Sequence, residues 1–317
     1  MAFTMHSHSG QFCPGHAKDE LEEVVKHAIS VGYKTLGLTE HMPRTELSDL
    51  YPEELTPSPE QSLSELTPRH KSYLLEAQRL QQKYASQIHI LIGFEGEWIR
   101  PAYGSLVQEL YSADSCIDYF IGSIHHAAGV PIDFDKEMFL AAKEKCGGTE
   151  EKLYAVYFDE QFEMLKFLRP KVVGHFDLIR LLSDETGRDL SPAGSWAGKE
   201  EIWSKIVRNL EFVVGYGGWL ECNTSALRKG LDEPYPARPI AEKFLELGGR
   251  FTFSDDSHGI AQVATNYVRG LDYLESLGVK ELWTLERSTH PGTQNGERAQ
   301  LTEKSVPISE FRADLKL

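Results

Sequence analysis

Cysteine is scarce in this sequence. The 317 residues include only four cysteines, Cys13, Cys116, Cys146 and Cys222. Their wide spacing contains no CxxC pair and indicates no disulfide framework. Disulfides are rare in reducing compartments, so we take the cytoplasm as the default location.

Basic residues and long apolar runs are also in short supply. With 33 Lys and Arg against 48 Asp and Glu, the formal charge is −15. A nucleic-acid-binding protein needs a basic surface, so we expect no nucleic-acid partner and no adhesion to anionic membranes. No segment approaches the roughly 18 uninterrupted apolar residues of a membrane span. The N-terminal MAFTMHSHSG lacks the basic and apolar regions of a secretory signal.

What the sequence does contain is a regular alternation of β-rich runs and amphipathic segments. The β-rich runs cover 2–6, 35–41, 88–95, 117–126, 171–177, 218–225 and 250–258. The helical patterns cover 18–33 and roughly 69–86, 150–169, 199–215, 236–248 and 264–278. This alternation predicts an α/β fold with a parallel sheet. Each β-run ends in His, Glu, Asp or Asn, and a barrel collects all such ends on one face. An open sheet would concentrate function at a switch point, so we favour a barrel.

We expect a single domain over residues 1–317. Two segments interrupt the alternation, the Pro-rich acidic 42–68 and the Gly-containing 127–149. Both are predicted as loop insertions over the active face, where they could act as a lid, although 42–68 could equally be a mobile surface loop. KELWTL at 280–285 is a weak candidate for an eighth strand, and 287–317 is a C-terminal extension without an assigned role.

Histidine is abundant, with twelve residues, and its placement suggests metal chemistry. Side chains two residues apart on a strand point the same way, so the HxH and DxH pairs can each grip one ion. The candidate ligands are His6, His8, His16, His41, Glu95, His125, His175, Asp256 and His258. A set of imidazoles and carboxylates without cysteine suits catalytic Zn, Mn or Fe, and nine ligands suffice for two or three ions. Any single one of these histidines could be an ordinary core residue, and short HxH strings also occur by chance.

The string SDDSH contains two aspartates, and either one could be the metal ligand. Asp256 has the Asp-x-His spacing that places both ligands on one face, whereas Asp255 should point away.

The order HSHSG, TEH, GFEGE, GSIHH, GHFD, ECN and SDDSH resembles the polymerase-and-histidinol-phosphatase (PHP) family of metal-dependent phosphoesterases. Within that family the sequence is most similar to the fungal histidinol-phosphate phosphatases, through HSHSGQFCPGH, TEHMPR, GSIHHAAGVPIDFD, VVGHFDLIRL and ECNTSALRKG. The resemblance implies a distorted (β/α)7 TIM-like barrel and a trinuclear site holding Zn, Fe or Mn.

The resemblance also implies a distribution of ligands among three ions. The first would take His6, His8, Glu95 and Asp256, the second His16, His41 and His258, and the third Glu95, His125 and His175, with Glu95 bridging. The implied reaction is hydrolysis of L-histidinol phosphate, a small phosphate monoester, in histidine biosynthesis. A metal-bridging hydroxide would attack phosphorus. Asp256 and His258 are the candidate catalytic residues, and Asp256 is one candidate acid for the leaving oxygen.

Residues near the strand ends are candidates for binding substrate. Arginine suits phosphate because of its bidentate fork, and Arg228 is the first choice, followed by Arg180 and Arg44. Asn223 could orient water or phosphate, and Glu97 could receive the substrate ammonium group or support packing.

Three other functions stay open on the sequence. Another PHP phosphoesterase could act on phosphotyrosine or nucleotides, although the charge of −15 disfavours a nuclease. A metal-dependent C–N hydrolase would usually carry a bridging lysine at a strand end, and none occurs here. A non-catalytic metal-binding protein is disfavoured by the intact ligand set.

Overall fold

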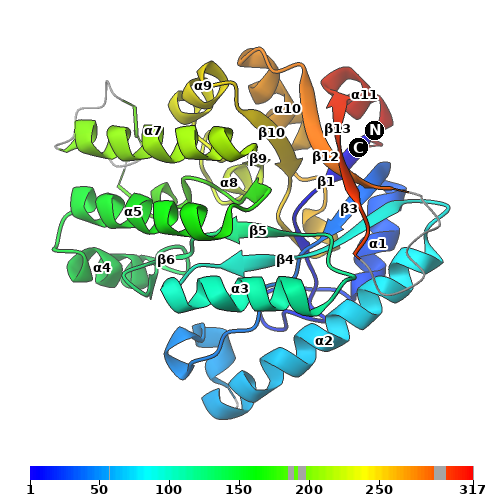
Figure 1. Ribbon diagram of the computed structural model, residues 1–317, viewed down its shortest axis with the longest axis horizontal. Helices are drawn as coiled ribbons and strands as arrows, with labels where there is room; N and C mark the ends of the chain where they lie inside the picture. The colour runs from blue at the N-terminus through cyan, green and yellow to red at the C-terminus, as the bar shows by residue number, and fades with distance from the viewer. Residues whose placement is uncertain (57, 185–188, 192–197, 289–297, 317) are drawn as a thin grey trace.

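A computed structural model describes residues 1–56, 58–184, 189–191, 198–288 and 298–316 of the chain (Figure 1). Seven parallel strands form the central sheet in the order β1-β3-β4-β5-β8-β9-β10. Their bounds are β1 (Ala2–Thr4), β3 (Tyr33–Leu38), β4 (His89–Glu97), β5 (Tyr119–Ser123), β8 (Val172–Val173), β9 (Trp219–Asn223) and β10 (Arg250–Ser254). Their residues are almost entirely buried, as expected for strands covered on both faces.

The two edges of this sheet meet, which makes it a barrel. The backbone amide of Met5, after β1, donates to the carbonyl of Phe253 in β10 at 3.2 Å. Beyond that point β2 (Ser7–His8) pairs in parallel with β11 (Ser257–His258). The nearly closed seven-stranded barrel confirms the predicted fold class.

Helices surround the barrel on its outside (Figure 1). They are α1 (Leu21–Ser30), α2 (Pro59–Lys83), α3 (Pro101–Ala113), α5 (Glu150–Leu168), α7 (Lys199–Tyr216), α9 (Arg238–Glu246) and α10 (Tyr267–Ser276). In α1 the helical spacing of apolar residues buries Leu21, Val24, Val25 and Ala28 against the sheet. A capping box between Glu20 and the helix fixes where α1 begins.

The segment 42–68 is more ordered than predicted. It contains η1 (Leu47–Asp49) and η2 (Pro52–Leu55), and α2 already begins at Pro59. The loop prediction is therefore wrong for 59–68. Ser58 caps this helix by accepting a hydrogen bond from the Gln61 amide, and proline is well tolerated in the first turn.

The segment 127–149 also differs from a plain loop. β6 (His126–Ala127) and β7 (Val130–Pro131) form a short antiparallel hairpin. The helix α4 (Lys136–Lys145) follows, with Asp135 accepting from the Met138 amide as its cap. Asp135 is a typical N-cap residue, so the sequence did contain a signal for the start of this helix. The neighbouring glycines favoured a loop prediction instead.

The C-terminal part is not an eighth barrel strand, which corrects that prediction. β12 (Glu281–Arg287) pairs antiparallel with β13 (Leu301–Pro307), outside the seven-stranded sheet. The Arg287 backbone amide donates to the His89 ring at 3.4 Å, and the guanidinium of Arg287 pairs with Asp118. Since His89 begins β4, this hairpin covers the amino ends of the strands, opposite the predicted ligands. Residues 289–297 and 317 of the predicted extension lie outside the described part of the chain.

The final helix, α11 (Ile308–Asp314), packs on the barrel closure. The ring of Phe311 lies 5.1 Å from Phe3 in β1, 5.4 Å from Phe253 in β10 and 5.9 Å from Tyr267. Within the extension, α11 therefore contributes Ile308 and Phe311 to the core. No helix in the described ranges is both long and apolar enough to cross a bilayer.

Phe311→Ala should lower the free energy of unfolding by about 3–5 kcal/mol, because it removes a fully buried ring. Urea denaturation measures this loss. Leu75→Ala, at a position that is 69% exposed, is the control and should change the free energy of unfolding by no more than about 0.5 kcal/mol. Equal unfolding midpoints for the two variants would contradict the packing role of α11.

Candidate metal centre

Eight of the nine predicted ligands meet at the carboxyl end of the barrel. Several lie just past their strand, since β3 ends at Leu38 and β8 at Val173. These residues form three groups, and within each group the potential ligand atoms, one from each residue, all lie within 4.8 Å of one another. The groups are His6, His8 and Asp256; His8, His41 and His258; and Glu95, His125 and His175.

Glu95 stands at the centre of these groups. Its Oε2 lies 3.3 Å from His6 Nε2 and 3.6 Å from His8 Nε2. Its Oε1 lies 3.0 Å from His175 Nε2 and 3.3 Å from His125 Nε2. Oε2 also lies 3.0 Å from His41 Nδ1. The two carboxylate oxygens thus face different sets of imidazoles, which is the geometry a bridging ligand requires.

The two aspartates of SDDSH face different surroundings. Asp256 Oδ1 lies 3.6 Å from His6 Nε2 and 3.5 Å from His8 Nε2. Asp255 instead accepts hydrogen bonds from the Tyr33 hydroxyl at 2.8 Å and the Ala264 amide at 2.6 Å. Asp255 therefore supports the fold from outside the centre.

The backbone is strained at two of the converging residues. His175 has φ 21° and Asp256 has φ 49°, both positive without being glycine. Such conformations cost about 1–3 kcal/mol each and persist where surrounding contacts over-determine them. Arg228 supplies some of these contacts, because its guanidinium donates to the carbonyls of Asp255 at 3.1 Å and Asp256 at 3.0 Å.

His16 reaches the same site from a loop but belongs to none of the three groups. Its ring lies 4.7 Å from that of His258 and 5.7 Å from that of His41. Its side chain is 44% exposed, and Nδ1 lies 3.1 Å from Glu53 Oε1. His16 therefore stands at the rim of the centre.

The buried histidines and carboxylates of the centre shift one another's pKa values. Burial raises the pKa of a carboxyl, but nearby histidines, His6 first, hold the pKa values of Glu95 and Asp256 well below their ordinary range. Burial lowers the pKa of His6, yet Asp256, Glu221 and Glu95 together raise it well above normal. Burial and the neighbouring His41 lower the pKa of His8 to about 3. Ionised carboxylates and neutral imidazoles are the forms that bind metals.

The imidazoles of His6 and His258 are oriented by contacts to their Nδ1 atoms. His6 Nδ1 lies 2.8 Å from Glu221 Oε2, and His258 Nδ1 lies 3.0 Å from the carbonyl of Asp256. In both residues Nε2 is buried and has no hydrogen-bond partner among the described residues. Metal-binding histidines are commonly held in this way.

Glu221 and Glu40 contact the centre or its loop but were not among the residues predicted from the sequence. Glu221 also accepts from the His175 amide at 3.2 Å, so it holds two of the converging residues. Glu40 accepts from the amide and hydroxyl of Ser9, and burial raises its pKa to about 8. Their positions in the sequence could have identified them, since Glu40 lies in TEH and Glu221 in ECN, both at the ends of predicted strands.

Two predicted substrate contacts have structural roles instead. Arg180 pairs with buried Asp177 at 2.7 Å and donates to the Pro234 carbonyl at 2.6 Å. Arg180 is 4% exposed and is not among the residues that line the cavity above the centre, described below, which corrects its assignment to phosphate binding. Asn223 is likewise fully buried, and its amide donates to Asp256 Oδ2 at 3.3 Å, so it orients that carboxylate and not the substrate.

Arg44 and Glu97 form one buried chain of charges. Arg44 donates to Glu97 at 3.1 Å and pairs at its other end with Glu54 of η2. Glu97 also lies 3.1 Å from His41 Nδ1. Burial disfavours the charge on Glu97, but Arg44 and His41 hold its pKa well below normal. Glu97 does not line the cavity, so of its two predicted roles the supporting one agrees with this internal pairing and the contact with an ammonium group does not.

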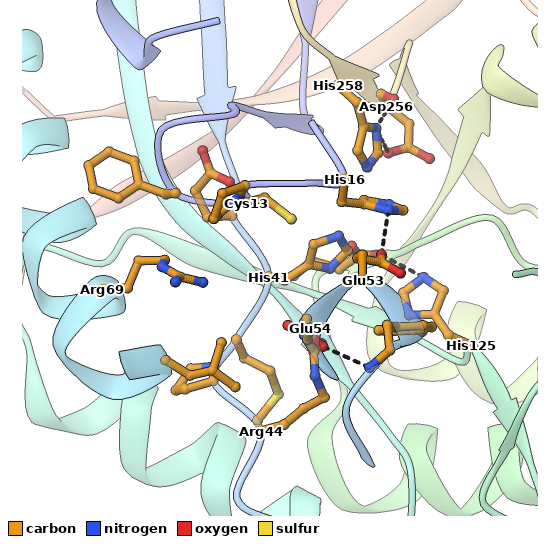
Figure 2. A pocket seen from close by; sticks show the side chains of 18 of the residues that line it. Cys13, His16, His41, Arg44, Glu53, Glu54, Arg69, His125, Asp256 and His258 are labelled. Carbon is orange, nitrogen blue, oxygen red and sulfur yellow. Dashed lines mark hydrogen bonds and ion pairs between the residues drawn. The ribbon is translucent and has the colours of Figure 1, made fainter. Parts of the chain in front are cut away.

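A cavity of about 380 Å³ opens above the centre. Figure 2 shows His41, His125, Asp256 and His258 on one side and Arg69 on the other. Glu53 and Glu54 reach into it from η2, so part of 42–68 does lie over the site. Arg228 and Lys229 also line it and supply positive charge near Asp256.

Comparisons with known proteins agree with this geometry. The PHP domain family matches residues 4–225. A Schizosaccharomyces pombe protein named "Probable histidinol-phosphatase" is 42% identical over 90% of this chain and 90% of its own length. "Histidinol-phosphatase" of Saccharomyces cerevisiae is 35% identical over 98% of this chain and 97% of its own length.

Solved structures share the fold. A Listeria monocytogenes protein superposes with a TM-score of 0.70 at 24% identity, over 84% of this chain and 99% of its own. Histidinol phosphate phosphatase from Lactococcus lactis, solved with zinc, L-histidinol and phosphate, gives a TM-score of 0.62 at 19% identity, over 89% of this chain and 96% of its own. With its barrel, its strand-end histidines and these matches, the chain belongs to the PHP domain family.

Proposed function

We propose that this protein is a metal-dependent phosphomonoesterase that hydrolyses L-histidinol phosphate to L-histidinol and phosphate in histidine biosynthesis. The observation that carries the proposal is the convergence of imidazoles and carboxylates on Glu95 beneath a cavity. The choice of substrate is supported by the two fungal relatives named as histidinol-phosphatases, at 42% and 35% identity.

The centre would hold two to three ions of Zn, Fe or Mn. His6, His8, Glu95 and Asp256 would bind the first, His16, His41 and His258 the second, and Glu95, His125 and His175 the third. The residues fit such ions, because the centre gathers buried imidazole nitrogens without partners around ionised carboxylates. Imidazole and carboxylate ligands suit these metals.

Bound ions of this kind acidify a water molecule and neutralise phosphoryl charge. The chain's own part is to position the groups around the phosphate. Glu221 fixes the ring of His6, and Arg228 holds the backbone that carries Asp256. Arg228 and Lys229 provide cationic side chains along the cavity wall.

Asp256 and His258 are the proposed catalytic residues, and the proton that the leaving oxygen takes up comes either from Asp256 or from a water molecule. Asn223 and Ser225 donate to Asp256 Oδ2, each at 3.3 Å, which leaves Oδ1 facing the centre. We place the reaction in the cytoplasm, consistent with four free cysteines.

A phosphate-release panel tests the substrate. L-histidinol phosphate should exceed nucleotides, phosphotyrosine peptide and sugar phosphates in kcat/KM by at least about tenfold, because a site built for specific polar groups rejects substrates that lack them. A higher kcat/KM for a nucleotide or phosphotyrosine peptide would assign the site to another PHP phosphoesterase activity.

Metal removal tests the chemistry. Dialysis against a chelator should abolish turnover, and Zn, Mn or Fe should restore it. His8→Ala should lower kcat by more than about 100-fold, because even mutation of a residue that only supports a metal ligand lowers metal affinity or activity about 10- to 100-fold. His27→Ala, in α1 and away from the cavity, is the control and should keep full activity. Full turnover by metal-free protein would exclude this mechanism.

Glu221→Gln tests the orientation of His6. The variant should release metal at about 10- to 100-fold lower concentration of a competing chelator, because the carboxylate behind the imidazole is lost. Metal retained after dialysis is the measurement, and exposed Glu211→Gln on α7 is the matched control. Equal retention by the two variants would show that Glu221 has no such role.

A further inference from the structure

Two polar side chains in the cavity wall have no partner in the described part of the chain. Asp133 and His70 both line the cavity. Oδ1 of Asp133 and both ring nitrogens of His70 are buried without a hydrogen bond, and neither residue forms an ion pair with any described residue. Buried polar groups are nearly always paired, so groups left unpaired beside a cavity point to a ligand that completes them.

Asp133 lies where the two inserted segments meet over the centre. Its neighbour Ile132 donates its amide to the carbonyl of His125 at 3.0 Å, which ties this segment to a candidate metal ligand. The next residue, Phe134, stacks on Tyr51 of the other insertion with ring centroids 6.0 Å apart. The carboxylate of Asp133 is therefore held in the cavity wall by a segment that is bonded to His125.

His70 lines the same cavity from α2. It is 6% exposed, and its ring lies 5.9 Å from Phe94 and 6.0 Å from Tyr73. Burial lowers its pKa to about 4, so the ring is neutral and offers one donor and one acceptor. Phe12 and Leu66 line the cavity on the same side and provide apolar surface for a flat ring.

We propose that these two residues determine which phosphate ester is hydrolysed, Asp133 by binding the substrate ammonium group and His70 by hydrogen bonding its imidazole ring. This inference rests on the proposed function, since L-histidinol phosphate carries both groups besides its phosphate. An ester that lacks them would leave both side chains unpaired, and such losses discriminate strongly between substrates.

Three esters separate the two roles. L-histidinol phosphate carries both groups, O-phosphoethanolamine carries only the ammonium group, and phenyl phosphate carries neither. Asp133→Asn should lower kcat/KM about 10- to 100-fold for the first two esters, mainly through KM, because a charge-assisted hydrogen bond is lost. His70→Phe should lower it about 5- to 10-fold for L-histidinol phosphate alone, since a neutral hydrogen bond is lost. Phenyl phosphate should respond to neither substitution.

Exposed Glu137→Gln on α4 and His27→Phe on α1 are the matched controls, and they should leave all three values unchanged. Thermal unfolding and metal content of each variant show that the barrel is intact. Equal losses on all three esters, or unchanged values for L-histidinol phosphate, would overturn the inference. A wild-type enzyme without preference for L-histidinol phosphate would instead overturn the proposed function, so the two failures are distinguishable.

Discussion

The structure depends on a concentration of buried charge around Glu95. Its two oxygens lie within 3.6 Å of nitrogens from five histidines, and Asp256 and Glu221 add further carboxylates to the same enclosure. In an apolar barrel interior such charges are costly unless they are paired or coordinate metal. Cations bound among them would resolve this cost and at the same time make the face attractive to a phosphate ester.

The rest of the fold holds this charge in place. The β2–β11 pairing brings His8 and His258 to corresponding positions at the seam where the barrel closes. At the opposite end, the β12–β13 hairpin and α11 cover the barrel, with Phe311 packed on both closing strands. Strained turns at His175 and Asp256 are tolerated because the surrounding frame is rigid.

The sequence predicted the barrel and the converging residues because both follow from local periodicity. Parallel strands place their carboxyl ends on one face, so residues such as His41 and His125 could be grouped without coordinates. The roles of Arg180 and Glu97 could not be predicted, because their partners Asp177 and Arg44 are fixed by tertiary packing. The helix that begins at Pro59 was not predicted because the segment is rich in proline and acidic residues. The pairing of β12 with β13 was not predicted because the two strands are not adjacent in the sequence.

Anomalous diffraction at the metal absorption edges is the most direct measurement of the central claim. Crystals of protein purified without chelator should show two or three anomalous peaks, each within bonding distance of one of the groups around Glu95. One carboxylate, that of Glu95, should contact two of them. A map without peaks there, with His175 Nε2 hydrogen-bonded directly to Glu95, would contradict the account.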